Sequence, residues 1–265
     1  MQPYYFQNIM LKGKKGIIFG IANDHSIAWG ISKKLSEYGA ELALTYQNDT
    51  LLKRIKPLSK EINSKLLIEC DFSQSNSIKK CFDDLNQEWN NIDFVVHAAA
   101  FSNKDELNGR YIDTSLSNFI NTLNISCYSF TEISKLASSM MNNGGSLLTL
   151  SFYGANKVMP NYNVMGVAKA ALEMSVKYLS VDLGKNNIRV NAISAGPMRT
   201  IAGAAIAKAR EVYKYTEKNS PLHRNVRLEE LGNTALYFVS DLSKAVSGEI
   251  HYVDCGFNII GMSQY

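Results

Sequence analysis

Apolar and polar residues follow two alternating patterns along the whole chain. Short runs rich in Val, Ile, Leu and Phe, typical of buried strands, are separated by longer stretches with helical spacing of apolar residues. We predict strands over residues 16–19, 41–46, 65–70, 92–97, 146–150, 188–193 and 250–253. We predict helices over residues 27–38, 50–62, 75–89, 115–141, 162–183 and 228–241.

Strands that alternate with helices predict one parallel sheet. Each strand–helix–strand unit closes right-handedly, so helices cover both faces, and strands buried on both faces are nearly all apolar. The sequence therefore predicts an α/β fold, a doubly wound parallel sheet of Rossmann type with about seven strands. No repeat, low-complexity stretch or linker divides the chain, so we expect residues 1–265 to form a single domain.

One segment, residues 198–227, breaks this alternation. It is helix-prone and alanine-rich, and it lies between the sixth predicted strand and the last predicted helix. Ligand sites in such sheets form beyond the carboxyl ends of the strands, so an insertion at this place is expected to act as a substrate-binding lid. A helical decoration that only packs against the domain is the alternative.

Composition limits the class of protein. Hydrophobic residues make up 46% of the chain and charged residues 20%, which fits a folded domain rather than a disordered chain. The net charge of +4, from 28 basic and 24 acidic side chains, is too small to predict nucleic-acid binding, although it would tolerate an acidic protein partner. No apolar run approaches the roughly 18 residues of a membrane span, and residues 1–10 do not resemble a signal peptide.

The cysteines point to a reducing compartment. They form no CxxC pair and no metal-type spacing with histidine, so no metal site is predicted. Scattered free thiols are typical of the cytoplasm, where we expect the protein to work. The four cysteines are Cys70, Cys81, Cys127 and Cys255.

The first predicted strand runs into a turn suited to a dinucleotide. Gly20 follows the strand directly, and a glycine there lets the backbone turn sharply and approach a pyrophosphate. The helix that begins near Ser26 and Ile27 offers unpaired N–H groups and the positive end of its dipole. The spacing, with Ala28 and Gly30 following, differs from GxGxxG, and a helix N-cap is the alternative role for Ser26.

Two later positions bear on the choice of dinucleotide. Gln47 follows the second strand, where such folds place an acidic residue for the ribose of NAD or a basic one for the phosphate of NADP. Its neutral side chain binds hydroxyls but supplies no charge for a phosphate, which favours NADH. Lys53 and Arg54, a turn later, keep NADPH open unless they form a solvated helix face. Asp71, after the third strand, is placed to accept from the adenine amino group; a buried or capping aspartate is the alternative.

Two tyrosine–lysine pairs after the fifth strand compete for a catalytic role. Short-chain dehydrogenases use a tyrosine and a lysine four residues later on one helix, a spacing that Tyr153 and Lys157 share. Lys157, however, lies in a Gly- and Asn-containing stretch before a proline, which predicts a loop. Tyr162 and Lys169 are seven residues apart, a rotation of about 700° that returns them to one helix face about 10 Å apart. Lys169 is followed by Ala-Ala-Leu in an amphipathic run, so we favour this second pair.

The wider spacing suits reduction of an enoyl thioester. In a ketone, the oxygen to be protonated is bonded to the carbon that receives hydride. In an enoyl thioester, hydride goes to the β-carbon and charge collects on the more distant thioester oxygen. An acid displaced along the helix by about 4.5 Å fits the second case. Tyr162 would donate a hydrogen bond to the enolate oxygen, and Lys169 would hold the nicotinamide ribose hydroxyls.

With these residues the chain resembles the bacterial NADH-dependent enoyl-acyl-carrier-protein reductases, a divergent branch of the short-chain dehydrogenase/reductase superfamily. The resemblance covers nearly the whole chain, and the residues that carry it are 20–30, 44–49, 160–169 (PNYNVMGVAK) and 189–197 (RVNAISAGP). It implies a dinucleotide-binding catalytic domain that reduces a trans-2-enoyl thioester in fatty acid elongation, with Tyr162 as the active-site tyrosine.

The resemblance also implies partners and binding residues. It implies a homotetramer, a mobile substrate-binding loop, and transient contact with acyl carrier protein, for which Lys208 and Arg210 are candidates. For the substrate it implies Ser102, Phe152 and Tyr162. For the dinucleotide it implies Gly20, Ser26, Ile27, Gln47, Asp71, Phe72, Ala99, Lys169, Met198, Arg199, Thr200, Ile201 and Ala202.

Two positions depart from the family pattern. Many members have a tyrosine where this chain has Phe152, which can wall an acyl pocket but cannot donate a hydrogen bond. Many also read Ser-Ile-Gly/Ala-Phe where this chain reads Ala-Ala-Ala-Phe, and the smaller Ala99 removes bulk beside the expected nicotinamide. The remaining alternatives are a 3-ketoacyl or other carbonyl reductase that uses Tyr153 and Lys157, and a catalytically silent dinucleotide-binding protein.

Overall fold

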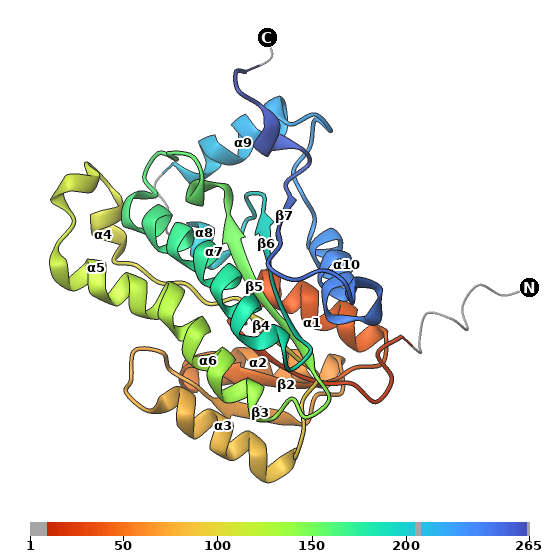
Figure 1. Cartoon of the computed structure of the whole chain (residues 1–265). Helices are drawn as coiled ribbons and strands as arrows, with labels where there is room; N and C mark the ends of the chain where they lie inside the picture. The colour runs from red at the N-terminus through yellow and green to blue at the C-terminus, as the bar shows by residue number, and fades with distance from the viewer. Residues whose placement is uncertain (1–9, 205–207, 264–265) are drawn as a thin grey trace, which may run out of the picture.

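The computed structural model, which describes residues 10–204 and 208–263, contains a seven-stranded sheet whose strand pairs are all parallel (Figure 1). The strand order is β3-β2-β1-β4-β5-β6-β7, so the sheet grows outward in both directions from the β1–β4 pair. This order confirms the predicted doubly wound α/β fold of Rossmann type. The strands are β1 Lys15–Phe19, β2 Glu41–Tyr46, β3 Leu66–Glu69, β4 Phe94–His97, β5 Gly145–Phe152, β6 Ile188–Ala195 and β7 Ile250–Val253.

Helices cover both faces of the sheet, because helices link successive strands (Figure 1). Successive residues of a strand point to opposite faces, so Ile18 packs in one apolar core and Ile17 in the other. Burial on both faces explains the apolar runs of β1 and β4. The helices on the first face are α1 Ile27–Glu37, α2 Asp49–Glu61 and α10 Leu228–Val239, and those on the second are α3 Ser77–Glu88, α6 Ser129–Ser138 and α7 Asn163–Gly184.

The single helix predicted over residues 115–141 is interrupted. α5 (Leu116–Leu123) passes through a π-helical turn, η2 (Asn124–Tyr128), before α6 begins. The buried hydroxyl of Ser126 in this turn accepts from the Phe101 N–H at 2.9 Å and donates to the Phe101 carbonyl oxygen at 3.0 Å. The turn therefore holds the loop that follows β4. Apolar periodicity does not reveal it, because the helix continues on both sides of one locally wider turn.

The other predicted boundaries lie within two residues of those observed. β5 and β6 each extend past their predicted ends, to Phe152 and Ala195, because they pair with each other in register along their whole length. The last predicted helix stops at Val239, and a short helical turn follows it. The remaining short elements are α4 Lys104–Leu107, η1 Tyr111–Asp113, η3 Tyr153–Ala155, η4 Asp241–Ser243 and η5 Phe257–Ile259.

The segment over residues 198–227 contains two helices, α8 (Ile201–Ala204) and α9 (Ala209–Asn219). Residues 205–207 of this segment, and residues 1–9 of the N-terminus judged not to be a signal peptide, lie outside the described residues. Within the described ranges, no helix is both long and apolar enough to cross a membrane.

A histidine is fully buried at the end of β4. Nδ1 of His97 lies 2.8 Å from Oγ1 of Thr149, and Nε2 lies 2.9 Å from Oγ of Ser129, so the ring joins β4 to β5 and α6. Burial, and after it the positive charge of Lys169, lowers the pKa of His97 to about 3. The imidazole is therefore neutral near pH 7, and protonating it would place a charge in the core.

We expect His97 to contribute to acid sensitivity of the fold. Its pKa is about 3 in the folded chain, against 6.5 for an unperturbed histidine, so stability that is present above pH 6.5 is lost as the pH falls towards about 3. The loss due to this residue is about 2 kcal/mol between pH 6.5 and about 4.5. Urea unfolding at a series of pH values measures it as the difference between the parent and His97→Phe.

His97→Phe should not show this part of the acid-induced loss of stability, and the two hydroxyls beside residue 97 should keep hydrogen-bond partners. The Thr149 hydroxyl retains the carbonyl oxygen of residue 97, and the Ser129 hydroxyl retains the carbonyl oxygen of Ile125. Equal acid-induced losses of unfolding free energy in the two proteins would contradict the prediction.

Candidate active site

The predicted binding residues converge on one edge of the sheet. Gly20, Ala99 and Met198 follow the carboxyl ends of β1, β4 and β6, while Gln47 and Asp71 follow β2 and β3. The strand order reverses between β1 and β4, and ligands of doubly wound sheets bind in the crevice outside such a switch point. Because the strands are parallel, the fold brings all five residues to the edge where a dinucleotide would lie.

Gly20 is required by the close approach of two strand ends. Its φ is +97°, and a Cβ atom at this position would lie 2.4 Å from the carbonyl oxygen of Ala98. A side chain would therefore both strain the backbone and collide with the end of β4. The missing side chain allows the ends of β1 and β4 to approach each other closely at the switch point.

Ser26 organises the turn that follows Gly20. It stands at the N-cap position of α1, but its side chain does not cap that helix. The buried hydroxyl instead accepts from the N–H groups of Ala22 at 3.0 Å and Asn23 at 3.1 Å. The N-cap alternative is therefore wrong for the side chain, and the first turn of α1, which begins at the half-buried Ile27, is left without a side-chain cap.

Gln47 and Asp71 are joined side chain to side chain. Nε2 of Gln47 donates to Oδ1 of Asp71 at 3.1 Å, and the same oxygen accepts from the N–H of Ser73 at 2.9 Å and its hydroxyl at 2.8 Å. Asp71 thus caps the turn after β3, which was the alternative to a ligand role. The pair presents a neutral amide and a carboxylate, and neither side chain supplies positive charge for a phosphate.

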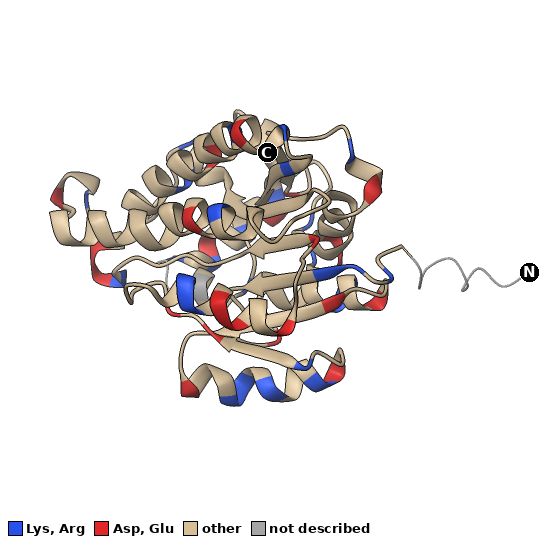
Figure 2. Cartoon of the chain, turned by 60° about the horizontal axis from the view of Figure 1, so that its bottom comes forward, with Lys and Arg blue, Asp and Glu red and all other residues tan. Residues whose placement is uncertain are grey.

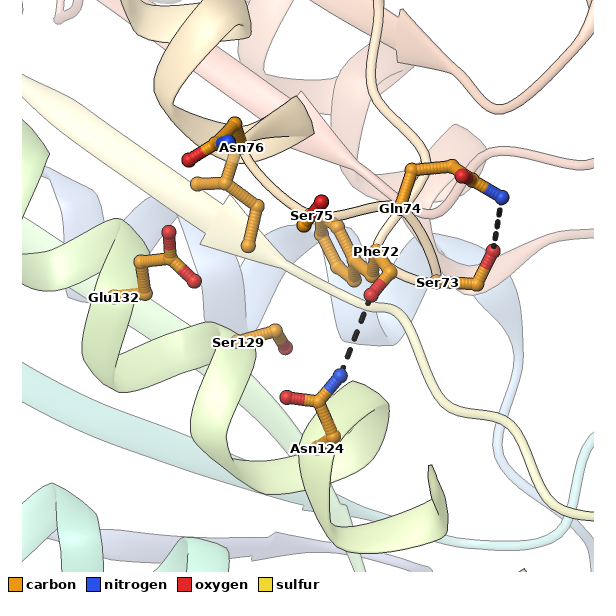
Figure 3. Close-up of a pocket in the computed structure, with 9 residues that line it drawn as sticks. Phe72, Ser73, Gln74, Ser75, Asn76, Asn124, Ser129 and Glu132 are labelled. Atoms are coloured by element: carbon orange, nitrogen blue, oxygen red, sulfur yellow. Dashed lines mark hydrogen bonds between the residues drawn. The ribbon is translucent and has the colours of Figure 1, made fainter. Parts of the chain in front are cut away.

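A cavity of about 280 Å³ lies beside Phe72, between the β3–α3 loop and α6 (Figure 3). Nδ2 of Asn124 in the π-helical turn approaches the Phe72 carbonyl oxygen at 3.5 Å. The Phe72 ring stacks on the ring of His97, with centroids 5.8 Å apart. Neither Tyr162 nor Lys169 is among the residues that line this cavity, so it is separate from the catalytic pair.

Tyr162 precedes α7 and Lys169 is the seventh residue of that helix, and both side chains are buried. Nζ of Lys169 donates to the Leu150 carbonyl oxygen, near the end of β5, at 2.7 Å. Tyr162 immediately precedes the helix, with φ −103° and ψ −28°, so the prediction that α7 begins at Tyr162 is wrong by one residue. The two side chains nevertheless approach the same strand end.

The competing pair does not share a helix. Tyr153 lies in the short turn η3, and its ring packs edge-on against Phe257, with centroids 5.6 Å apart. Lys157 lies in an exposed bend, as the sequence predicted. The arrangement of a tyrosine and a lysine four residues apart on one helix is therefore not formed by Tyr153 and Lys157.

The Tyr162 ring is held by apolar neighbours. The Phe152 ring meets it edge-on with centroids 5.0 Å apart, and a Cβ atom at Gly154 would lie 2.5 Å from its Cδ1 atom. Met159 packs against the same apolar cluster. Phe152 therefore supports the ring by packing, without the hydroxyl that many family members carry at this place.

Burial changes the acidity of both members of the pair. Burial, and then the charge of Glu173, raises the pKa of Tyr162. Burial lowers the pKa of Lys169 to about 8, against raising effects of Cys127 and then Glu173. At pH 7 the pair consequently offers a hydroxyl that keeps its proton and an ammonium that is mostly charged.

A further residue of the site, Glu173, belongs to no sequence motif. Its side chain is buried one helical turn after Lys169, and Oε1 accepts from the Ser151 hydroxyl at 2.6 Å. Oε2 accepts from Nδ2 of Asn156 at 2.9 Å, and the same nitrogen lies 3.0 Å from the Tyr252 hydroxyl. The signal that points to Glu173 is its spacing of four residues from Lys169, which places both on one helix face.

Ser102, the predicted substrate contact, is engaged by α5. Oγ1 of Thr122 donates to its hydroxyl at 2.9 Å, and Nδ2 of Asn118 approaches the same atom at 3.3 Å. These contacts of the Ser102 hydroxyl fix the loop after β4. Ala99, beside the expected nicotinamide in the same loop, is half-buried.

The predicted nicotinamide segment links β6 to α9. Met198 packs against the first core, and the Arg199 guanidinium lies 4.5 Å from the centroid of the Tyr213 ring. Oγ1 of Thr200 accepts from the N–H of Gly203 at 2.9 Å and so caps α8, while Ile201 is about half exposed. The side chain of Ala202 lies outside the described residues.

Across the described part of the chain, no group of three or more His, Cys, Asp or Glu side chains is placed to hold a metal ion.

Comparisons with known proteins agree with this geometry. A protein of Rickettsia typhi named an NADH enoyl-acyl-carrier-protein reductase is 55% identical over 255 residues, which are 96% of this chain and 98% of that protein. A Rhizobium meliloti protein of the same description is 56% identical over 96% of this chain and 95% of its own length.

Solved structures match as well. The enoyl reductase of Anaplasma phagocytophilum in complex with NAD has a TM-score of 0.94 and 54% identity over 97% of this chain and 98% of that one. The Bacillus cereus enzyme, solved with NADP⁺ and an indole naphthyridinone, has a TM-score of 0.93 and 41% identity over 96% of this chain and 100% of its own. A family model described as enoyl-(acyl carrier protein) reductase matches residues 20–258, and the chain belongs to this family.

Proposed function

We propose that the protein reduces the trans-2 double bond of an enoyl thioester of acyl carrier protein, with NADH as the reductant, in fatty acid elongation. The observation that carries this proposal is the buried pair of Tyr162 and Lys169 at the end of β5. The relatives from Rickettsia and Rhizobium are named for NADH, and the Anaplasma structure contains NAD. The neutral Gln47 supports the same choice over NADPH.

The residues at the sheet edge fit a dinucleotide. The uncapped first turn of α1, which follows the Gly20 turn, suits a pyrophosphate, because backbone N–H groups and the helix dipole favour negative charge there. When bound, NADH supplies the hydride that is transferred to the β-carbon of the substrate. The residues that would hold it are Gly20, Ser26, Ile27, Gln47, Asp71, Phe72, Ala99, Lys169 and residues 198–202.

Tyr162 stabilises the enolate. Its hydroxyl donates a hydrogen bond to the thioester oxygen as negative charge collects there. Burial raises the pKa of Tyr162, so the donor keeps its proton at working pH. Phe152 holds the ring in place and walls the acyl site, and Ser102 borders the substrate with its hydroxyl held by α5.

Lys169 holds the nicotinamide ribose. One N–H of its ammonium is directed at the Leu150 carbonyl, which leaves two donors for the ribose hydroxyls. Its positive charge also favours the developing enolate. The lysine thereby places the reactive end of the dinucleotide beside Tyr162.

Residues 198–227 act as a substrate-binding lid on a single catalytic domain. The cation–π contact of Arg199 with Tyr213 ties the nicotinamide segment to α9. Lys208 and Arg210 are exposed at the start of α9 and suit an acidic carrier protein. In Figure 2 the Lys and Arg segments of the ribbon are interspersed with Asp and Glu segments, and this mixed charge supports a protein rather than a nucleic acid as the partner.

The protein assembles as a homotetramer and works in the cytoplasm. Exposed apolar side chains lie on α5 and α7, which contact each other, and a second copy of the chain would cover them. The free thiols agree with a reducing compartment. The exposed apolar residues on these helices are Leu116, Ile120, Val167, Met174, Tyr178 and Val181.

Oxidation of NADH by trans-2-enoyl thioesters tests the function directly. We expect turnover with the enoyl substrate and NADH, much slower turnover with NADPH because Gln47 provides no positive charge, and none with an acetoacetyl thioester. The absorbance of the reduced nicotinamide measures all three. Turnover of the keto substrate alone would identify a carbonyl reductase, and NADH binding without any turnover would identify a silent nucleotide-binding protein.

Substitution of the two tyrosines distinguishes the catalytic one. Tyr162→Phe should lower kcat by about 10²–10³-fold, because the enolate loses its donor, with little change in NADH affinity. Tyr153→Phe removes the hydroxyl of a ring that packs on Phe257 and should leave kcat near that of the parent. Steady-state kinetics of both variants measure this, and the reverse order of effects would overturn the assignment.

The assembled mass tests the tetramer. Light scattering after size-exclusion chromatography should give about four times the 29.5 kDa of one chain. Tyr178→Glu, on the exposed apolar face of α7, should lower the mass, because burying a carboxylate in an apolar interface is unfavourable. Lys53→Glu, exposed on α2, is the control and should leave the mass unchanged. A monomeric parent would exclude this assembly.

A further inference from the structure

Glu173 is a buried carboxylate whose two oxygens both accept hydrogen bonds. Oε1 accepts from Ser151 at the end of β5, and Oε2 accepts from Asn156 in the β5–α7 loop. Nδ2 of Asn156 also lies 3.0 Å from the Tyr252 hydroxyl, which comes from β7. A single side chain of α7 thus contacts the end of β5 and the loop that leads to Tyr162, and it connects through Asn156 to β7.

Glu173 and Lys169 fasten the same helix to consecutive residues of one strand. Nζ of Lys169 donates to the carbonyl oxygen of Leu150, and the carboxylate of Glu173 accepts from the hydroxyl of the next residue, Ser151. The two side chains are four residues apart on α7 and therefore neighbours on one helix face. An acid and a base are therefore buried one helical turn apart on α7.

We propose that Glu173 is a positioning residue that acts through Lys169: its charge keeps the ammonium protonated, and its hydrogen bonds to Ser151 and Asn156 hold the strand end and loop around Tyr162. This proposal rests on the proposed function, in which Lys169 binds the ribose of NADH. In this role Glu173 acts through Lys169 and needs no contact with substrate or dinucleotide.

Among the groups around Lys169, Glu173 is the one whose negative charge can offset the cost of burying the ammonium. Cys127 faces it from η2, but burial raises the pKa of that thiol, so the thiol is neutral near pH 8. His97 faces it from β4 and is neutral, because its pKa is about 3. Tyr162 keeps its proton, since burial raises its pKa.

The titratable groups that face Glu173 include the Tyr162 phenol and, from β7, the Tyr252 phenol, and Tyr153 faces Tyr252. Burial and the charge of Glu173 raise the pKa of Tyr252 on β7, and burial and Asp254 raise that of Tyr153. Both rings therefore stay neutral in the range where Lys169 titrates. Burial lowers the pKa of Lys169 to about 8, so its protonated form is lost as the pH rises through that value.

The test is the pH dependence of NADH binding and of kcat/KM for NADH. In the parent both should decline above pH 8 or so, because the free protein loses the ammonium. In Glu173→Gln, which keeps the shape but removes the charge, the midpoint should fall by about one pH unit. At pH 8 this shift corresponds to about a fivefold additional loss of NADH affinity.

Two control variants separate charge from packing. Ser151→Ala removes one hydrogen bond to Glu173 but leaves its charge, so kcat should fall while the midpoint stays at the parent value. Asp182→Asn removes an exposed carboxylate further along α7 and should change neither quantity. NADH fluorescence titration gives affinity without turnover. All measurements are made at a temperature below the lowest melting midpoint among the parent and the variants.

Each outcome bears on a different claim. A midpoint in Glu173→Gln equal to that of the parent, whatever the loss of turnover, would overturn the role of the charge and leave a packing role. An equal shift in Ser151→Ala or Asp182→Asn would overturn the assignment to Glu173. A parent that binds no NADH at any pH would overturn the proposed function itself, before any variant is compared.

Discussion

The burial of the Lys169 ammonium is the constraint on which the site depends. Removing an ammonium from water costs several kcal/mol unless hydrogen bonds and an opposite charge offset it. The Leu150 carbonyl, 2.7 Å from Nζ, and Glu173, one helical turn away, meet this need. α7 must therefore lie against β5 in one register, and that register also places Tyr162, which stands at the head of the same helix.

The two ends of the crevice, at Phe72 and at Lys169, are connected through the interior of the sheet. Phe72 stacks on His97, His97 binds Thr149 of β5, and the charge of Lys169 reaches His97 strongly enough to help lower its pKa. His97 and Thr149 are fully buried, so little water screens their contact, whereas Phe72 is half-buried and lines the cavity beside α6. The two ends of the edge where a dinucleotide would lie are therefore linked through buried side chains.

Periodicity was sufficient for the order and type of the main elements, because burial on both faces forces apolar runs in the strands. It also separated Tyr162 from Tyr153, since only the former precedes an amphipathic helix. It could not predict the bond between Gln47 and Asp71, which depends on how two loops meet. Glu173 also escaped it, because a carboxylate in a helix is indistinguishable from a solvated one until β5 is placed beside it.

The π-helical turn between α5 and α6 determines which side chains of this long helical segment face the loop after β4 and which face the sheet. It accommodates one more residue than regular winding would, which offsets the following positions by about 100°. Thr122 can thereby face the loop of Ser102 while Phe130 faces the sheet. Deleting one residue within 124–128 would convert this turn to regular α-helix and leave both helix faces in their present orientation. A deletion elsewhere in the helical segment would rotate one of those faces into water.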